Sequence, residues 1–384
     1  MRSRDEQFDP ALLRRVKGEA LSRRELLLRG SAMGAVAALG PLVAACGGSS
    51  NGGASGGGGG AQLNYFSWEP WARPEFVAPF EQEHDVKIKS AFYSSGQEML
   101  TKLQAGGSKI YDMLSPVNND IPRLVGAGLA EPFDLSKVPN HELVIPHFRD
   151  YPDLVIDGKT YMVPFVWGTD TVAHNKEHIP EVTSWNVLFD KQYKGRLAVQ
   201  DSAFQTIALT AIALGHTDPS PFDLTDQQLE ECKKKLIEAK PLWRTIWSNF
   251  TDLQNLFISG EVWAAQAWLT IIEPVRAAGV DIGWAFVDEG SIGWIEGLTP
   301  VKGTKHLDLV HAFADYCAGP DFMYKVFQET GYYPATTAVK DRMTPEEIEQ
   351  ANLANPELPN KQFYYATPPN LPRWEEVWNE VKAA

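Results

Sequence analysis

The chain has 384 residues and a formal net charge of −14 at pH 7. Residues 1–45 hold eight Lys or Arg and five Asp or Glu, a net charge of +3, so the rest of the chain carries −17. Such an acidic body argues against binding to nucleic acid, which needs clustered Lys and Arg. The body is also longer than the chain that one hydrophobic core usually serves, so we expect two lobes.

The N-terminal residues have the pattern of an export signal. The pair Arg23-Arg24 precedes a weakly apolar run of small residues that ends in Ala44-Ala45-Cys46. A twin arginine before such a run is typical of the Tat pathway, and the small residues before the cysteine indicate a lipoprotein cleavage site. A membrane-spanning helix is the alternative, but it needs about 20 apolar residues and only about 16 separate Arg29 from Cys46. We therefore predict a twin-arginine lipoprotein signal peptide at 1–45.

Residues 46–61 are predicted to form a lipidated tether. Cys46 would carry the lipid, and the run that follows it is rich in Gly and Ser. Such a composition behaves as a flexible coil. We therefore expect export by the Tat pathway and a lipid anchor that holds the body in the periplasm or at the outer face of the cell membrane.

From residue 62 onward, short β-rich runs alternate with amphipathic helical segments. Strands are predicted at 63–68, 86–92, 112–115, 195–201 and 282–286, and helices at 73–84, 96–104, 120–127, 204–214 and 374–382. This rhythm predicts an α/β fold with mixed, mostly parallel sheets flanked by helices. In such sheets, ligands lie beyond the carboxyl ends of the strands. We therefore expect the site at the turns after Ser67, Ser115, Val199 and Ile292.

The sequence gives no enzyme signal. Residues 174–178 match the H-x-x-E-H pattern of one zinc-protease class, which needs both histidines on one helical face. A strand-like run precedes them and Pro180 follows, so we interpret the match as a chance pattern in a loop. The nucleophile elbow, the phosphate loop, the dinucleotide motif and metal-ligand cysteine spacings do not occur. We expect no catalytic residue, no metal and no cofactor.

Tryptophans beside carboxylates occur at predicted strand ends. Trp68 and Trp71 bracket a Glu-Pro pair after the first strand. Trp268 ends a predicted strand, and Trp294 stands two residues before Glu296. Aromatic faces attract a desolvated ammonium group by about 2 kcal/mol or more, and carboxylates add charge-assisted hydrogen bonds. This combination predicts a site for a small cation.

The chain from Gln62 onward resembles the spermidine/putrescine-binding proteins of bacterial ABC transporters. The matching motifs are YFSWEPW at 65–71, YMVPFVWG at 161–168, TSW at 183–185, YKGRL at 193–197, GEV at 260–262, GWIE at 293–296 and TGY at 330–332. The resemblance implies a two-lobed periplasmic-binding-protein fold of type II, whose lobes close over a ligand like a hinged clamp. It places lobe 1 at 62–167 plus 293–340 and lobe 2 at 168–292 plus 341–384, with hinge crossovers near 167–168, 291–292 and 340–346.

The resemblance also implies roles for individual residues. The family's aromatic walls correspond to Trp68, Trp71, Trp268, Trp294 and Tyr332. Glu296 stands where the family has an aspartate that grips a substrate amine. A glutamate can make the same contact from one methylene further out.

Other positions depart from the family. In the second lobe, an acidic pair of the family corresponds to Ser202 and Gln205, with Asp201 adjacent. In the first lobe, a tyrosine of the family corresponds to Asn119. A buried ammonium without a partner is costly, so the far end of the ligand is either neutral or held by Asp201 or Glu69.

We therefore expect an extracytoplasmic, monomeric binding protein of an ABC importer, not an enzyme. It would capture a small cation, a polyamine such as putrescine or spermidine, and deliver it to the permease. Alternatives are a related binding protein for a quaternary amine, a thiamine-like cation or ferric iron. Iron remains open because Tyr332 and Tyr333 are adjacent and phenolates can ligate it. An exported enzyme on this fold would need a nucleophile–base pair, which the sequence does not show.

Overall fold

The computed structural model describes residues 61–384. The predicted signal peptide at 1–45, Cys46 and the predicted tether up to residue 60 lie outside the described residues. The described part is built around one mixed sheet. Its main path runs in the order β2 (Val86–Phe92), β1 (Ala61–Ser67), β3 (Met113–Leu114), β11 (Ser291–Pro300), β6 (Val163–Asn175), β9 (Ala264–Trp268), β7 (Leu197–Gln200) and β8 (Trp243–Trp247). Off this path are β10 (Ile282–Ala285) and β12 (Tyr333–Pro334) beside β6, and β13 (Gln362–Tyr364) beside β11.

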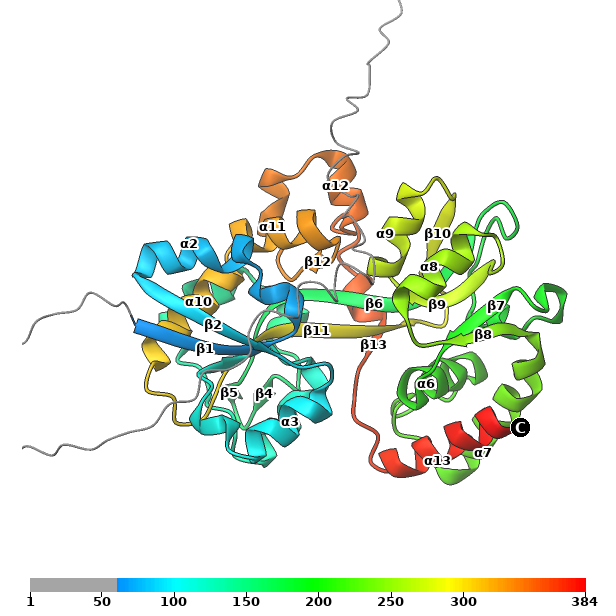
Figure 1. Ribbon diagram of the computed structural model, residues 1–384, viewed down its shortest axis with the longest axis horizontal. Coiled ribbons are helices and arrows are strands. Elements are labelled where there is room, and N and C mark those ends of the chain that lie inside the picture. Colours follow the sequence, from blue (N-terminus) through cyan, green and yellow to red (C-terminus); the bar gives the residue numbers. More distant parts are fainter. Residues whose placement is uncertain (1–60) are drawn as a thin grey trace, which may run out of the picture. The chain divides into compact units, whose positions relative to one another are not determined.

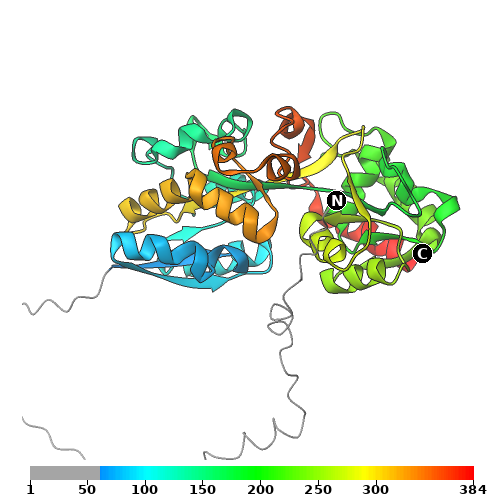
Figure 2. The ribbon, with the colours of Figure 1, turned by 90° about the horizontal axis from the view of Figure 1, so that it is seen from above.

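The long strands β6 and β11 join two halves of this sheet (Figure 1). We call the half with β1, β2 and β3 the first lobe, and the half with β7, β8, β9 and β10 the second lobe. Figure 2 shows the same two halves from above, with the green strand β6 running from one to the other. The two strands are antiparallel, and Trp294 stands opposite Gly168. The two-lobed α/β fold predicted from the sequence is confirmed.

Parallel and antiparallel pairings occupy different parts of the sheet. β1 pairs in parallel with β2 and β3, and β7 pairs in parallel with β8 and β9. β6 pairs antiparallel with β9, β10, β11 and β12. All 13 residues of β6 and all 10 of β11 are buried, as expected for central strands that are covered on both faces.

Helices cover the two lobes (Figure 1). Those of the first lobe are α2 (Pro74–His84), α3 (Gly96–Gln104), α4 (Ile121–Gly126), α5 (Pro146–Arg149), α10 (Leu307–Ala318), α11 (Pro320–Thr330) and α12 (Pro345–Gln350). Those of the second lobe are α6 (Ala203–Leu214), α7 (Asp226–Ala239), α8 (Phe250–Ile258), α9 (Leu269–Ala277) and α13 (Leu371–Ala383). The short strands β4 (Val155–Ile156) and β5 (Lys159–Thr160) form a separate hairpin. The predicted order of strands and helices up to residue 127 is confirmed as β1, α2, β2, α3, β3 and α4.

The chain passes between the lobes a third time near its C-terminal end. Helix α12 lies beside α11, where the Tyr324 hydroxyl donates to the Glu347 carboxylate at 3.2 Å. Strand β13 then pairs with the second-lobe end of β11, and α13 packs on α6 and α7. The third passage therefore lies between α12 and β13. Within residues 61–384, no helix is both long enough and apolar enough to cross a membrane.

Candidate ligand-binding site

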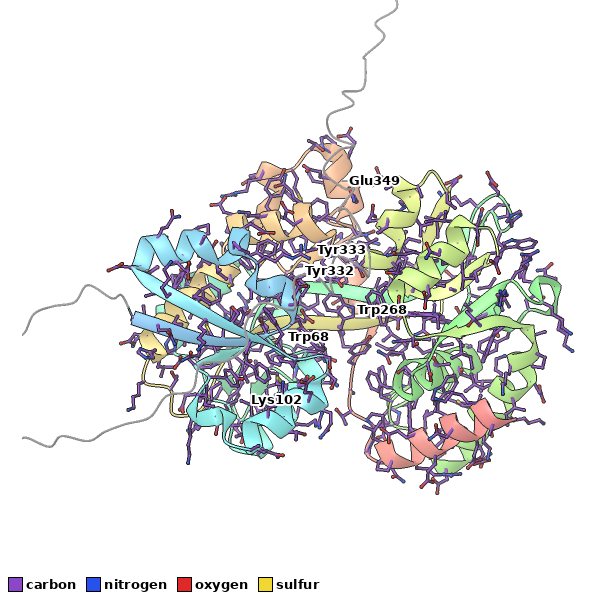
Figure 3. The ribbon with its side chains drawn as sticks, in the orientation of Figure 1. Trp68, Lys102, Trp268, Tyr332, Tyr333 and Glu349 are labelled. Carbon is purple, nitrogen blue, oxygen red and sulfur yellow. The ribbon has the colours of Figure 1, made fainter. Side chains whose placement is uncertain are left out.

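A cavity of about 610 Å³ lies between the lobes, and its wall comes from both of them. The first lobe contributes residues after β1, at the start of α3 and around α4. The second lobe contributes residues at the end of β7, in α6, at the start of α8 and at the end of β9. Figure 3 shows Trp68, Tyr332 and Trp268 around the space where the lobes meet. Three of the four strand ends singled out in the sequence, those after Ser67, Ser115 and Val199, lead into this wall.

Aromatic rings form a large part of the wall. Trp68 directly follows β1, and Trp268 is the last residue of β9. The ring of Tyr332 lies 4.9 Å from that of Trp294, nearly perpendicular to it, and 5.9 Å from that of Trp71. These spacings are typical of favourable aromatic contacts. The five aromatic residues predicted from the sequence therefore all line one cavity.

Glu296 lies inside strand β11, where the expected turn after Ile292 does not exist. The short residues Ser291 and Gly293 suggested a turn, but Gly293 is needed in a strand, because a Cβ there would lie 2.8 Å from the ring of Tyr364. The register of β11 against β6 shifts between Glu296 and Gly297. Such a bulge changes the direction in which a side chain leaves its strand. Here it occurs at Glu296, whose side chain lines the cavity.

The carboxyl group of Glu296 is held in an apolar environment. Burial raises its pKa to about 8, and the hydrogen bond from Trp71 opposes that rise. The indole Nε1 of Trp71 donates to Oε2 of Glu296 at 2.6 Å. Among residues 61–384, Glu296 has no cationic side chain within ion-pair distance. A cation that enters the cavity would therefore meet a carboxyl group that no protein charge neutralises.

A second carboxyl group of the wall, Asp120, already has a partner. Its Oδ1 lies 3.3 Å from Nη1 of Arg123. A Cβ at Gly96 would collide with this carboxylate, so the side chain packs directly against the backbone at the start of α3. Burial raises the pKa of Asp120 to about 6, and Arg123 opposes the rise. Asp120 is thus a largely buried partner of Arg123.

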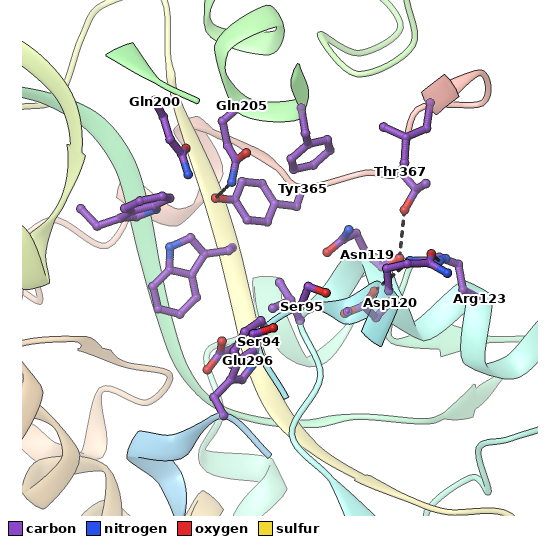
Figure 4. Close-up of a pocket in the computed structure, with 18 of the residues that line it drawn as sticks. Ser94, Ser95, Asn119, Asp120, Arg123, Gln200, Gln205, Glu296, Tyr365 and Thr367 are labelled. Atoms are coloured by element: carbon purple, nitrogen blue, oxygen red, sulfur yellow. Dashed lines mark hydrogen bonds and ion pairs between the residues drawn. The ribbon is translucent and has the colours of Figure 1, made fainter. Parts of the chain in front are cut away.

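The second-lobe wall is made of uncharged polar groups and rings (Figure 4). Gln205, in the first turn of α6, donates from Nε2 to the Tyr365 hydroxyl at 3.3 Å. Gln200 ends β7 and directs its amide toward the same place (Figure 4). Phe204 packs its ring 5.0 Å from that of Tyr365. Tyr365 itself is fixed by Asn118, whose Nδ2 donates to the Tyr365 carbonyl at 2.7 Å.

Three predicted ligand residues lie outside the cavity wall. Asp201 accepts a hydrogen bond from Trp378 at 2.8 Å and forms an ion pair with Lys382 at 2.9 Å. Both partners lie on α13, so the Asp201 carboxylate attaches that helix to the second lobe. Ser202 is the N-cap of α6 and bonds the Gln205 amide. Glu69 is exposed on the turn between Trp68 and Trp71. By contrast, the predicted residues Asn119 and Gln205 line the cavity.

Only one of the two adjacent tyrosines faces the cavity. Tyr332 lines it, whereas the ring of Tyr333 packs 4.9 Å from that of Trp167. Burial raises the pKa of Tyr332 to about 12 and the pKa of Tyr333 further. The two phenols therefore do not face the cavity together, as a pair of iron ligands would need.

The sequence prediction missed several wall residues, which are Asp120, Gln200, Phe204, Phe250 and Tyr365. Gln200 lies directly after Val199, where the strand-end rule expected a turn, but it was not singled out; in the structure it is the last residue of β7. Tyr365 follows β13, a three-residue strand with no periodic pattern, so no local signal marks it.

The site as a whole combines one buried, unpaired carboxyl group with aromatic walls and neutral hydrogen-bonding groups. Such a site suits a small organic cation.

Comparisons with known proteins agree with this geometry. Residues 75–359 match the model of the family described as bacterial extracellular solute-binding protein. The chain is similar to the spermidine/putrescine-binding periplasmic protein of Escherichia coli, with 24% identity over 297 residues that cover 76% of this chain and 82% of that protein. It is also similar to the putrescine/cadaverine-binding protein of Pseudomonas aeruginosa, with 28% identity over 270 residues, 66% of this chain and 74% of that protein.

Among solved structures, the fold is similar to the spermidine/putrescine ABC transporter substrate-binding protein of Streptococcus pneumoniae. The TM-score is 0.74 and the identity 21%, over 84% of this chain and 99% of that one. The resemblance expected from the sequence motifs is confirmed at the level of the family. With the family model covering most of its length, this chain belongs to the bacterial extracellular solute-binding proteins.

Proposed function

We propose that this protein captures a cationic amine of the polyamine type between its lobes and delivers it to the permease of an ABC importer. The observation that carries the proposal is Glu296, a buried carboxyl group without a cationic protein partner in the described residues, set among aromatic rings. An ammonium group there gains a charge-assisted hydrogen bond from the carboxylate and attraction to the ring faces. The relatives named for spermidine, putrescine and cadaverine support the same class of ligand.

The arrangement of the lobes supports a role in delivery rather than catalysis. The described lobes are joined by the strands β6 and β11 and one later passage, as in proteins that close around a ligand by a hinge. The predicted signal peptide at 1–45 would direct export of such a carrier, and the lipid on Cys46 would keep it beside a permease in the membrane. A single polypeptide that encloses one amine is sufficient for this role, so the proposal includes a monomer without catalytic activity.

Calorimetric titration of the purified protein with putrescine, spermidine, choline and thiamine tests the proposal. We expect binding of an amine of the polyamine type, and we expect Glu296→Gln to weaken it at least about tenfold, because the variant keeps the shape but cannot carry the compensating charge. Glu69→Gln is the matched control, since Glu69 lies between Trp68 and Trp71 in the sequence but outside the cavity wall. Failure of every amine to bind, or equal binding by the Glu296→Gln variant, would refute the proposed function.

A further inference from the structure

The cavity wall offers one negative charge for a ligand. Asp120 and Glu296 are the carboxyl residues of the wall within residues 61–384. Arg123 lies 3.3 Å from Asp120, so this pair contributes no net charge. In the described part of the chain, the one side-chain partner of Glu296 is the neutral indole of Trp71. Because a buried charge without a partner is costly, the site has a place for one ammonium group and not for two.

Among the residues that the structure describes, the opposite wall, on the second lobe, contains no carboxylate. Its polar groups are Gln200, Gln205 and the hydroxyl of Tyr365. The adjacent carboxylate of Asp201 is held by Lys382 at 2.9 Å and Trp378 at 2.8 Å, away from the cavity. An ammonium group at this wall would lose its hydration without gaining a negative partner.

The hydrogen-bonding groups of this wall have a defined pattern. The hydroxyl of Ser202 donates to Oε1 of Gln205, which leaves Nε2 to donate to the Tyr365 hydroxyl at 3.3 Å. Tyr365 therefore accepts from Gln205, and its own O–H remains available to donate. Oε1 of Gln200 is buried and has no hydrogen-bond partner in the described residues. The O–H of Tyr365 and Oε1 of Gln200 thus give the wall both a donor and an acceptor, the two kinds of group that complement an amide C=O and N–H.

We propose that the cargo is an amine with a single ammonium group at Glu296 and an uncharged amide at Gln200 and Tyr365, the class of mono-N-acylated diamines. The inference rests on the proposed function, and it narrows the class of ligand from amines of the polyamine type to amines with one charged end. The aliphatic chain between the two ends would lie against the rings of Trp268 and Trp294, both of which line the cavity. The amide end is then recognised by its hydrogen bonds to Gln200 and Tyr365. The second ammonium group of a diamine cannot form both, because it has no acceptor for the Tyr365 O–H.

Calorimetric titration with N-acetylputrescine and putrescine tests the inference, because the two differ only at one end. We expect the protein to bind N-acetylputrescine at least about tenfold more tightly than putrescine. Gln205→Glu supplies a carboxylate at the second-lobe wall and should reverse this preference. Tyr365→Phe keeps the ring but removes the donor, so it should lower the ratio of N-acetylputrescine affinity to putrescine affinity about fivefold.

The possible outcomes separate the two proposals. Tighter or equal binding of putrescine by the unaltered protein overturns the inference, and if Glu296→Gln still abolishes that binding, the proposed function stands. Absence of binding by either amine and by spermidine overturns both. Thermal unfolding of each variant, monitored by circular dichroism, shows whether it is folded. If Gln205→Glu does not fold, the affinity ratio of the unaltered protein and the Tyr365→Phe variant decide the inference.

Discussion

The indole of Trp71 donates a 2.6 Å hydrogen bond to the carboxylate of Glu296, although 225 residues separate the two along the chain. Trp71 comes from the turn after β1, and Glu296 from the strand that joins the lobes. The bond favours the ionised form of Glu296 against the burial that raises its pKa. It also fixes the direction of the carboxylate before a ligand arrives, which lowers the ordering cost of binding.

Trp71→Phe should therefore weaken amine binding at pH 7. The variant keeps an aromatic ring but loses the donor, so the pKa of Glu296 rises further and the carboxylate becomes less available. We expect a loss of about fivefold in affinity, the size of one hydrogen bond. Calorimetric titration measures it. Trp263→Phe is the control, because the Trp263 indole donates to the Gly260 carbonyl at 3.1 Å outside the cavity wall; an equal loss in both variants would contradict the role of Trp71.

Binding of an amine should release a proton. With its pKa raised to about 8, Glu296 is mostly protonated at pH 7 in the free protein, whereas an ammonium ligand needs the carboxylate. As the pH is raised toward 8, the affinity for the amine should consequently increase, by about tenfold for each pH unit. Above pH 8 the affinity should stay constant until the ligand amine itself loses its proton near pH 10. Titration at pH 7 in two buffers of different ionisation enthalpy should give close to one released proton per ligand. A heat that is independent of the buffer would show that Glu296 is already ionised.

Sequence patterns predicted those parts of the site that depend on local rules. Trp68 follows a strand and Trp268 ends one, and the carboxyl ends of parallel strands meet at one edge of a sheet. Gln205 was predicted only from the family resemblance. The pairing of Trp71 with Glu296 could not be derived in this way, because it depends on how two distant segments pack. The same holds for Asp201, whose carboxylate is occupied by Lys382 on α13.

The predicted fold was correct for a related reason. Strands and helices alternate with clear patterns up to residue 127, so the first lobe follows from periodicity. Strand β11 was less visible, because Gly293 and Ser291 weaken its pattern and its stability comes from pairing with β6 along the whole junction. Tyr365 lies beyond any patterned element, and bonds to two distant residues, from Asn118 to its carbonyl and from its N–H to the Gly293 carbonyl, hold it in the cavity wall.

Gly168→Ala should disturb the junction between the lobes. A Cβ at this position of β6 would collide with the indole of Trp294 on the paired strand β11. Displacement of Trp294 removes part of the aromatic wall, so we expect lower thermal stability and a loss of amine affinity of about tenfold. Gly126→Ala is the control: it lies in helix α4 with no atom within 4 Å of the added Cβ, and should be neutral or stabilise by about 0.5–1 kcal/mol. Unchanged binding by Gly168→Ala would contradict this role.

Asp170→Asn should stabilise the protein at alkaline pH. Burial raises the pKa of Asp170 to about 8, and the bond from Gln266 Nε2 at 2.7 Å opposes the rise only partly. The folded state therefore binds a proton that the unfolded state, with a pKa near 3.8, has already lost. Its contribution makes stability fall as the pH rises from about 4 to about 8, and remain level above 8.

The variant Asp170→Asn removes this proton binding but keeps a carbonyl acceptor for Gln266. We expect a melting temperature at pH 8.5 that is higher than that of the unaltered protein by at least about 2 °C, and a clearly smaller difference at pH 4. Thermal unfolding at a series of pH values measures the change. A difference that is the same at every pH would mean that packing, rather than the charge of Asp170, is responsible.

Asp201→Asn should affect stability and leave ligand binding intact. Partial burial works against the charged form of Asp201, but the bonds from Lys382 and Trp378 outweigh it and hold its pKa below the ordinary value. Loss of the negative charge weakens the attachment of α13 to the start of α6. Because the Asp201 and Lys382 side chains are each 36% exposed, the cost should be about 1 kcal/mol or less, a fall of about 1–3 °C in melting temperature.

Amine affinity of the Asp201→Asn variant should stay within about twofold of the unaltered protein, since the Asp201 carboxylate lies outside the cavity wall. Lys382→Met is the matched variant, because it removes the other charge of the same pair and should lower the melting temperature to a similar extent. The two substitutions together should cost less than the sum of the separate changes, because each removes the same interaction. A tenfold loss of affinity in Asp201→Asn alone would instead assign its carboxylate to the ligand, and the second-lobe wall would then hold an ammonium group.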